Sequence, residues 1–265
     1  MKPLAVSLTA LSLLLAAAAL AAGPEKPTPA GEARSAAPNT LSAAEKAAGW
    51  RLLFDGKTSK GWRGLNRADF PADGRWSIDD GAIHRVAEGK HVVDLVTTDQ
   101  FDSFDLRWEW KISEAGNSGL KYLVDESMGK RKDDGVGFEY QMLDDARHPD
   151  AKKGKDGDRT SGSLYDLIPA SKDKVLHPPG QWNESRVVVD GNHVEHWLNG
   201  GKVLSYERGS AEFKKLIADS KFKDIPRFGE VSKGHLLLQD HGNEVFVRSI
   251  KIKVAKAKTA STASK

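Results

Sequence analysis

Several short segments of this 265-residue sequence carry polar side chains that can act as acids, as bases or as hydrogen-bonding groups. Glu139 and Gln141 lie two residues apart in VGFEYQML, so on a strand both side chains point the same way. Carboxylates, amides and imidazoles bond to sugar hydroxyls, and a carboxylate can also act as an acid or a base. If the strands are neighbours in one curved sheet, these groups converge in a concave groove. The residues expected to face that groove are Arg107, Glu109, Lys121, Glu139, Gln141, His196, Gln239 and His241.

The spacing of carboxylates around Glu139 disfavours ordinary retaining glycoside hydrolysis. That reaction needs an acid and a nucleophile at a fixed separation. Glu139 and Asp144 are five residues apart, so both face one side of a strand only if a bulge intervenes. The pattern is similar to the paired-carboxylate strand of jelly-roll β-glucanases, but the middle position here is Gln141, which cannot be the second carboxylate.

The segment DDARHPD (144–150) concentrates groups that can bind a metal ion. Its carboxylates suit Ca²⁺, and a histidine among carboxylates suits Mn²⁺ or Zn²⁺. The spacing matches no strict loop consensus, and a polar loop with Asp at turn positions is the alternative. We therefore treat Asp144 and His148 as candidate ligands of a divalent cation, Ca²⁺ or Mn²⁺, and no other cofactor is expected.

The elements that must position these groups are mostly β-strands. In DLRWEWKI (105–112), large apolar residues alternate with charged ones, which is typical of a strand with one buried face. Ser42 and Glu45 form a capping box that predicts one short helix, and 210–220 predicts a second. Many short strands with Gly and Asn turns predict an all-β, two-sheet antiparallel sandwich. The expected strands are 105–112, 119–124, 136–143, 185–189, 193–198, 202–207, 235–239 and 245–254.

The two ends of the chain differ from its body. Residues 1–22 combine Lys2, an apolar run and a small-residue cleavage site, which predicts a secretory signal peptide rather than a retained membrane anchor. Residues 23–45 are rich in Pro, Ala and Gly and predict a flexible linker. The body extends over 46–254, and residues 255–265 predict a disordered basic tail.

The charge and the absence of cysteine narrow the function and the location. The formal net charge is +3, and removing Lys2, Lys256, Lys258 and Lys265 leaves about −1 for the body. The body therefore lacks the basic footprint of a nucleic-acid-binding protein. With zero cysteines there is no disulfide scaffold and no lipid-anchored N-terminal Cys. We expect a periplasmic or secreted protein without a membrane span after signal cleavage.

A series of short motifs then resembles one family. Leu53–Lys57 is LFDGK, 137–145 is GFEYQMLDD, 162–167 is GSLYDL and 234–242 is GHLLLQDHG, and three further motifs lie between them. In this order, over about residues 48–254, the series resembles the 3-keto-disaccharide hydrolase family. The resemblance implies a jelly-roll sandwich of the concanavalin or LamG type. It also implies cleavage of 3-keto-glycosides or 3-keto-disaccharides made by a partner oxidoreductase.

The implied substrate accounts for the missing second carboxylate. A ketone at C3 acidifies the hydrogen on C2, so a base can form an enolate, the glycosidic oxygen leaves by β-elimination, and water then adds. Such a reaction needs a base, a group that stabilises the enolate and an acid. We expect Glu139 or His241 as the base, with Glu139 preferred, and Lys121 or a bound cation as the stabilising group. The residues expected to bind the substrate are Arg107, Glu109, Gln141, Tyr165, His196, Asn199 and Gln239.

Two other functions remain open at this point. A jelly roll can also be a non-catalytic carbohydrate-binding module, because the fold does not decide the function. Conventional hydrolysis of a non-oxidised β-glucan is the second alternative. The stretch 148–161 is rich in Lys, Asp and Gly, and is either a substrate-shaping loop or a solvated insertion.

Overall fold

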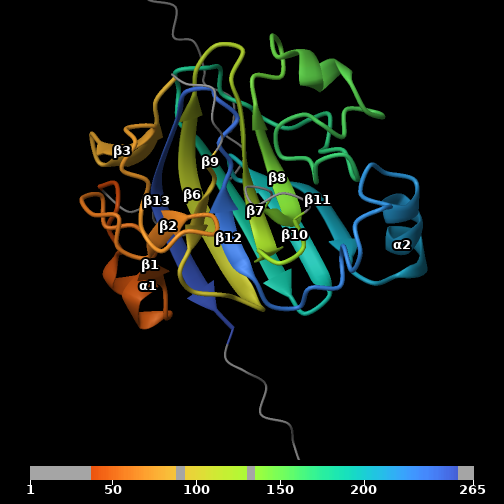
Figure 1. Cartoon of the computed structure of the whole chain (residues 1–265), viewed down its shortest axis with the longest axis horizontal. Coiled ribbons are helices and arrows are strands. Elements are labelled where there is room, and N and C mark those ends of the chain that lie inside the picture. The colour runs from red at the N-terminus through yellow and green to blue at the C-terminus, as the bar shows by residue number, and fades with distance from the viewer. Residues whose placement is uncertain (1–36, 88–92, 130–134, 256–265) are drawn as a thin grey trace, which may run out of the picture. The chain divides into compact units, whose positions relative to one another are not determined.

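The alternating segments form two antiparallel sheets packed face to face, which confirms the predicted sandwich (Figure 1). The computed structural model describes residues 37–87, 93–129 and 135–255. The predicted signal peptide (1–22), the linker up to residue 36 and the tail from residue 256 lie outside the described residues. In the part that is described, no helix is both long and apolar enough to cross a membrane.

The larger sheet has eight strands in the order β11-β10-β9-β6-β13-β4-β3, with β1 also paired to β13. All of its pairs are antiparallel, and β13 is long enough to pair with β6 on one edge and with both β4 and β1 on the other. The strands of this sheet are β1 (Arg51–Leu52), β3 (Trp76–Asp79), β4 (Ala82–Arg85), β6 (Phe104–Ile112), β9 (Asn183–Asp190), β10 (His193–Leu198), β11 (Gly201–Glu207) and β13 (Val245–Val254).

The smaller sheet has five strands in the order β2-β5-β12-β7-β8, so β8 is an edge strand. Lys121 on β7 pairs directly with Glu139 on β8, and Gly119 pairs with Gln141. The register of these two strands therefore places a lysine beside a glutamate. The strands of this sheet are β2 (Trp62–Gly64), β5 (Leu95–Thr97), β7 (Asn117–Asp125), β8 (Val136–Leu143) and β12 (His235–Leu238).

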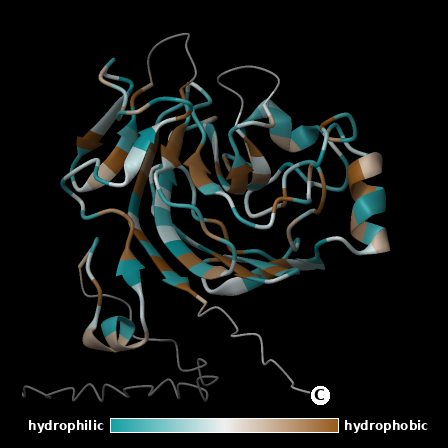
Figure 2. Cartoon of the chain, turned by 60° about the horizontal axis from the view of Figure 1, so that its bottom comes forward, coloured by the Kyte–Doolittle hydropathy of each residue, from teal (hydrophilic) through white to brown (hydrophobic). Residues whose placement is uncertain are grey.

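The core lies between the sheets and is rich in aromatic residues. Trp108 from the larger sheet meets Tyr140 from the smaller one edge to face, with ring centroids 4.9 Å apart. The Trp110 indole N–H donates to Ser185 Oγ at 2.8 Å, so the ring is buried with its polar atom bonded. Each such fully buried large side chain contributes about 1.5–3 kcal/mol to folding. Figure 2 shows the hydrophobic residues along the strands of both sheets.

The eight predicted strands correspond to β6 through β13, and β8, β10 and β13 have the predicted bounds. The Asn and Gly residues at 117–119 predict a turn, and this was wrong: Asn117 and Ser118 belong to β7, and the turn before it lies at Glu114 and Ala115. Strands β1–β5 were not predicted, because four residues or fewer give too little alternation to recognise.

Both predicted helices are present. α1 (Ala43–Ala47) has the capping box, and Ser210 caps α2 (Ala211–Ala218); a 3-10 turn, η1 (Pro149–Lys152), was not predicted. The predicted linker boundary at residue 45 needs correction. Asn39 exchanges hydrogen bonds with Ser249 at 2.8 and 3.2 Å, so the segment from Asn39 onward already packs on the sandwich.

Candidate functional site

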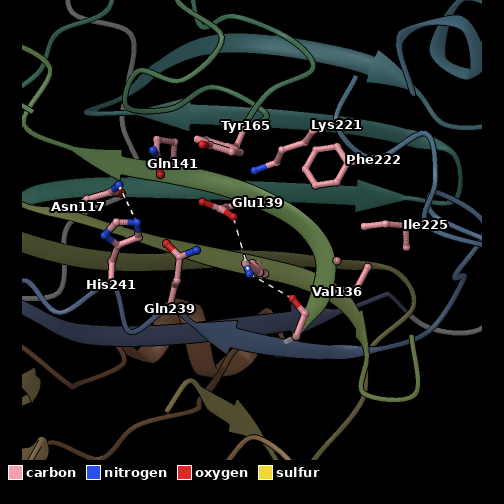
Figure 3. Close-up of a pocket in the computed structure, with 13 residues that line it drawn as sticks. Asn117, Val136, Glu139, Gln141, Tyr165, Lys221, Phe222, Ile225, Gln239 and His241 are labelled. Carbon is pink, nitrogen blue, oxygen red and sulfur yellow. Dashed lines mark hydrogen bonds and ion pairs between the residues drawn. The ribbon is translucent and has the colours of Figure 1, made fainter. Parts of the chain in front are cut away.

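A pocket of about 310 Å³ lies on the outer face of the smaller sheet (Figure 3). Strand β8 supplies its floor because Phe138, Tyr140 and Met142 are buried in the core, which turns the side chains between them outward. The segment between β8 and β9 that carries Tyr165, the segment after α2 and the segment after β12 complete the walls. The lining residues are Asn117, Lys121, Gly135, Val136, Gly137, Glu139, Gln141, Tyr165, Lys221, Phe222, Ile225, Gln239 and His241.

The centre of the pocket holds a carboxylate beside a lysine. Lys121 Nζ is 3.9 Å from Glu139 Oε2 and donates to the Gly135 carbonyl at 3.1 Å. Glu139 is 8% exposed, so little of it is in contact with solvent. Gln141, with its amide nitrogen turned toward two acceptors, donates to the Ser118 carbonyl at 2.9 Å and to Glu139 Oε1 at 3.3 Å. The Lys121 ammonium and the Gln141 amide thus hold the Glu139 carboxylate in one orientation.

Gly119 makes room for this carboxylate. A Cβ at that position would lie 3.0 Å from both Cγ and Oε1 of Glu139. Such contacts are tighter than those that Cβ atoms ordinarily make, so a larger residue would push the carboxylate aside. Glycine on the neighbouring strand is therefore part of the site.

A second lysine reaches the pocket from the segment after α2. Lys221 is exposed as a residue, but its ammonium points toward Glu139 and lies 4.0 Å from the centroid of the Tyr165 ring (Figure 3). Desolvation lowers the pKa of Lys221, and Glu139 and Asp166 oppose that shift. The group is therefore better suited to give up a proton than a lysine in water.

Ionic side chains of Asp150 and Arg159 hold Tyr165 in position. Its hydroxyl donates to Asp150 Oδ2 at 2.7 Å, and Arg159 bonds to both Asp150 and Asp166. Burial raises the pKa of Tyr165, and the bond to Asp150 raises it further. The phenol thus stays protonated and serves as a rigid wall under Lys221. Asp150 and Arg159 belong to the 148–161 loop, so that loop supports the pocket wall.

The opposite end of the pocket carries unused hydrogen-bond acceptors. Asn117 Oδ1 and Gln239 Oε1 are buried and have no hydrogen-bond partner among the described residues. Asn117 Nδ2 lies 3.4 Å from His241 Nε2. A buried acceptor without a partner is costly unless water or a ligand donates to it. This end of the pocket is thus suited to a ligand with several hydroxyl groups.

A buried ion pair positions the segment that carries Gln239 and His241. Arg85 Nε donates to Asp240 Oδ1 at 2.7 Å, and both side chains are 0% exposed. Asp240 also accepts from the backbone N–H groups of Val93 and Gly242. Asp240 therefore anchors the turn between its two pocket-lining neighbours.

The structure brings together six of the residues predicted from sequence and adds others. The predicted residues in the pocket are Lys121, Glu139, Gln141, Tyr165, Gln239 and His241. Sequence reasoning missed Lys221, Phe222 and Ile225, because the 219–230 segment has no alternation or motif that would single it out. Asn117 was missed as a site residue because it was predicted to lie in a turn.

Arg107 and Glu109 do not belong to the groove, which corrects the prediction. They do share one strand face, but it is the outer face of the larger sheet, on the far side of the core from the pocket. Arg107 lies 4.7 Å from the Trp50 ring centroid, and Glu109 accepts from Arg248 at 2.7 Å. These residues form surface ion and cation–π pairs.

His196 and Asn199 also lie elsewhere. His196 is 0% exposed in the core, because Val194 and Leu198 turn the same face of β10 inward. The neighbour Trp197 points outward and lies 5.2 Å from the Arg186 guanidinium. Asn199 is in the turn after β10, where its Oδ1 accepts from the Glu184 N–H at 2.8 Å. Both are structural residues.

Asp144 and His148 are committed to the loop after β8 rather than to the pocket. Asp144 accepts from the backbone N–H of Ala115 and from Arg147, and His148 Nδ1 accepts from the Asp150 N–H. In the described part of the chain, no group of three His, Asp or Glu side chains is arranged to hold a metal ion. The divalent cation stays a prediction.

An antiparallel sandwich with a polar pocket on one sheet defines a jelly-roll protein of the class that includes lectins and carbohydrate-active enzymes. The 3-keto-alpha-glucoside-1,2-lyase-like domain matches residues 49–253. A 3-keto-disaccharide hydrolase of Bacteroides thetaiotaomicron is 36% identical over 245 residues, which cover 83% of each chain. The chain belongs to the 3-keto-alpha-glucoside-1,2-lyase-like family, and this confirms the resemblance seen in the sequence.

Two crystal structures of candidate glycosyl hydrolases from Parabacteroides distasonis share the fold. The first has a TM-score of 0.74 at 34% identity and covers 83% of this chain and 100% of its own. The second has a TM-score of 0.58 at 26% identity and covers 78% of this chain and 99% of its own.

Proposed function

We propose that this protein is an exported enzyme that cleaves the glycosidic bond of 3-keto-glycosides, including 3-keto-disaccharides, by elimination followed by hydration. The observation that carries the proposal is the composition of the pocket. Among the described lining residues, Glu139 is the single carboxylate, and the two lysines Lys121 and Lys221 lie around it. A two-carboxylate hydrolysis lacks its second group there, whereas elimination beside a ketone needs one base and cationic stabilisation.

In the proposed reaction, Glu139 removes the C2 proton of the 3-keto sugar. The electron pair moves to the C3 oxygen, and Lys121, 3.9 Å from the carboxylate, stabilises the resulting enolate. The enolate then re-forms the ketone, and the C1–O bond breaks. Water adds to C1 of the enone, and C2 receives a proton from Glu139 after this carboxyl proton has exchanged with solvent, so the net result is hydrolysis. The free acceptors of Asn117 and Gln239 bind sugar hydroxyls.

The experiment follows a 3-keto-glucoside in D₂O by NMR, with Glu139→Gln compared to wild type. We expect wild type to release the aglycone with deuterium at C2. Glu139→Gln should lose at least about a hundredfold in turnover, because general-base catalysis contributes about 10²–10⁴-fold. Glu230→Gln, an exposed glutamate away from the pocket, is the matched control. Near-normal turnover by Glu139→Gln, or release without deuterium at C2, would exclude this mechanism.

The proposal includes two requirements outside the pocket. The substrate must first be oxidised at C3, so a partner oxidoreductase has to supply it. Export would rest on cleavage after residue 22, which N-terminal sequencing of the mature protein from a periplasmic or culture fraction tests. An uncleaved N-terminus would refute the signal-peptide prediction.

A further inference from the structure

The pocket is chemically uneven from one end to the other. Asn117, Gln239 and His241 gather at one end, Glu139 lies in the middle, and apolar groups occupy the other end (Figure 3). The side chains at the apolar end are Val136, Phe222 and Ile225, beside the backbone of Gly135 and Gly137. A substrate whose reacting carbon lies over Glu139 must therefore extend from a polar region into an apolar one.

Ring stacking and backbone hydrogen bonds hold the apolar wall of the pocket in a fixed conformation. The Phe222 ring stacks on Phe228 with centroids 4.3 Å apart and planes 3° from parallel. The Phe222 N–H donates to Ser220 Oγ at 3.0 Å, and the Ile225 N–H donates to the Phe222 carbonyl at 2.9 Å. One face of the Phe222 ring is thus covered by Phe228, and the segment is held in a tight turn.

Lys221 lies at the border between the two regions. Its ammonium is 5.0 Å from the Phe222 ring centroid and 4.0 Å from that of Tyr165, and it points toward Glu139 (Figure 3). We propose that Lys221–Ile225 forms the leaving-group subsite, in which Phe222 and Ile225 receive an aromatic or other apolar aglycone and Lys221 protonates the departing glycosidic oxygen. This inference rests on the proposed function.

Glu139 and Lys221 both return to their starting protonation states within one turnover. Glu139 takes the C2 proton, the C1–O bond breaks, and Lys221 gives one proton to the aglycone oxygen. In the hydration step, water gives its oxygen to C1 and a proton back to Lys221, while Glu139, whose carboxyl proton has exchanged with solvent, delivers a proton to C2. The lowered pKa of Lys221 suits both directions of this transfer.

A sugar as the leaving group fits this subsite less well than an apolar aglycone. Its hydroxyls would lose water and meet Val136, Phe222 and Ile225, which offer no side-chain hydrogen bonds. Unpaired hydroxyls are penalised on burial, whereas an aromatic ring gains contact area against Phe222. We therefore infer that the preferred substrates are 3-keto-glycosides of apolar alcohols or phenols.

The first test compares 2-phenylethyl and methyl 3-keto-glucosides, whose leaving alcohols have similar acidity. Wild type should prefer the phenylethyl substrate by at least about tenfold in kcat/KM. Phe222→Ala should reduce that preference by about tenfold. If the alanine variant folds poorly, Phe222→Leu is measured instead, and it should retain part of the preference. Phe246→Ala, on the outer face of the larger sheet, is the matched control and should leave the preference intact. An equal loss on both substrates in Phe222→Ala would overturn the subsite.

The second test separates Lys221 from the binding wall. Lys221→Met should lose at least about a hundredfold on the methyl substrate but less than about tenfold on a p-nitrophenyl 3-keto-glucoside, whose leaving group needs no acid. C2 exchange in D₂O should persist in this variant. Lys223→Met, an exposed lysine in the same segment, is the control. Equal losses on both substrates would overturn the role of Lys221, whereas a wild type that neither exchanges nor cleaves any 3-keto-glycoside would refute the proposed function itself.

Discussion

Protonation of His196 should destabilise the sandwich from its centre. The ring is buried between the sheets, and its Nδ1 lies 3.0 Å from the Gly162 carbonyl, which can only accept. Nδ1 therefore carries the proton, and Nε2 accepts from the Tyr122 hydroxyl at 2.8 Å. Tyr122 in turn lies 2.7 Å from the Tyr206 hydroxyl. A proton on Nε2 would break this chain of bonds and place a charge in the core.

The magnitude of this loss of stability follows from the pKa of His196, which burial lowers from 6.5 to about 4. The folded state then binds fewer protons than the unfolded state between these values, so stability falls as the pH drops through this window. Between pH 7.5 and 4.5, one such group lowers the free energy of unfolding by about 2.5 kcal/mol. Above pH 6.5 the effect is absent.

Urea unfolding of wild type and His196→Gln, followed by tryptophan fluorescence at both pH values, measures this effect. Glutamine keeps a donor and an acceptor but does not titrate. The variant should be less stable at pH 7.5, and its deficit should shrink by about 2.5 kcal/mol at pH 4.5. The comparison between variants is needed because other groups titrate in the same range. A deficit that stays constant with pH would refute the reasoning.

Three further predictions concern residues that support the site. Asp94 accepts from the Asp240 N–H at 2.8 Å, and desolvation raises the pKa of its carboxyl from 3.8 to about 6, so the stability that its protonated form contributes is lost as the pH rises. In the same urea assay, the free energy of unfolding that Asp94→Asn loses relative to wild type should be about 2 kcal/mol larger at pH 4.5 than at pH 7.5. This change is opposite in sign to that of His196→Gln. Gly119→Ala should lower kcat at least about tenfold in the 3-keto-glucoside assay while the melting temperature changes little, because its Cβ displaces Glu139. Asp240→Asn should lower the free energy of unfolding by about 1.5–3 kcal/mol in urea, because it removes the charged acceptor of the hydrogen bond from the buried Arg85 Nε.

The local pattern was sufficient for the long strands of the sandwich. Alternation of period two identifies a strand with one buried face, and 136–143 was predicted with its final bounds for this reason. The capping box of α1 was equally local, since Ser42 and Glu45 interact within one turn. Where strands are short, as in β1–β5, local signals fail and long-range pairing decides.

The faces of the strands show the limit of this reasoning. Arg107 and Glu109 were correctly placed on one face of a strand but assigned to the wrong side of the protein. His196 was predicted to face the groove, but its neighbour Trp197 faces outward instead, because a tryptophan between Arg186 and Lys202 is stable on the surface. Alternation therefore gives the two faces of a strand but not which of them is buried.

The family, the β-sandwich and six of the residues in the pocket could be predicted from the sequence, because short motifs and alternation are local properties. The position of Lys121 beside Glu139 could not be predicted in this way, because it depends on the register of β7 and β8. The tertiary structure also places Lys221 and Phe222 in the pocket, about 80 residues further along the chain than Glu139, from a segment without alternation or a motif. Contacts between distant segments are set by packing of the whole core, and no local spacing encodes them.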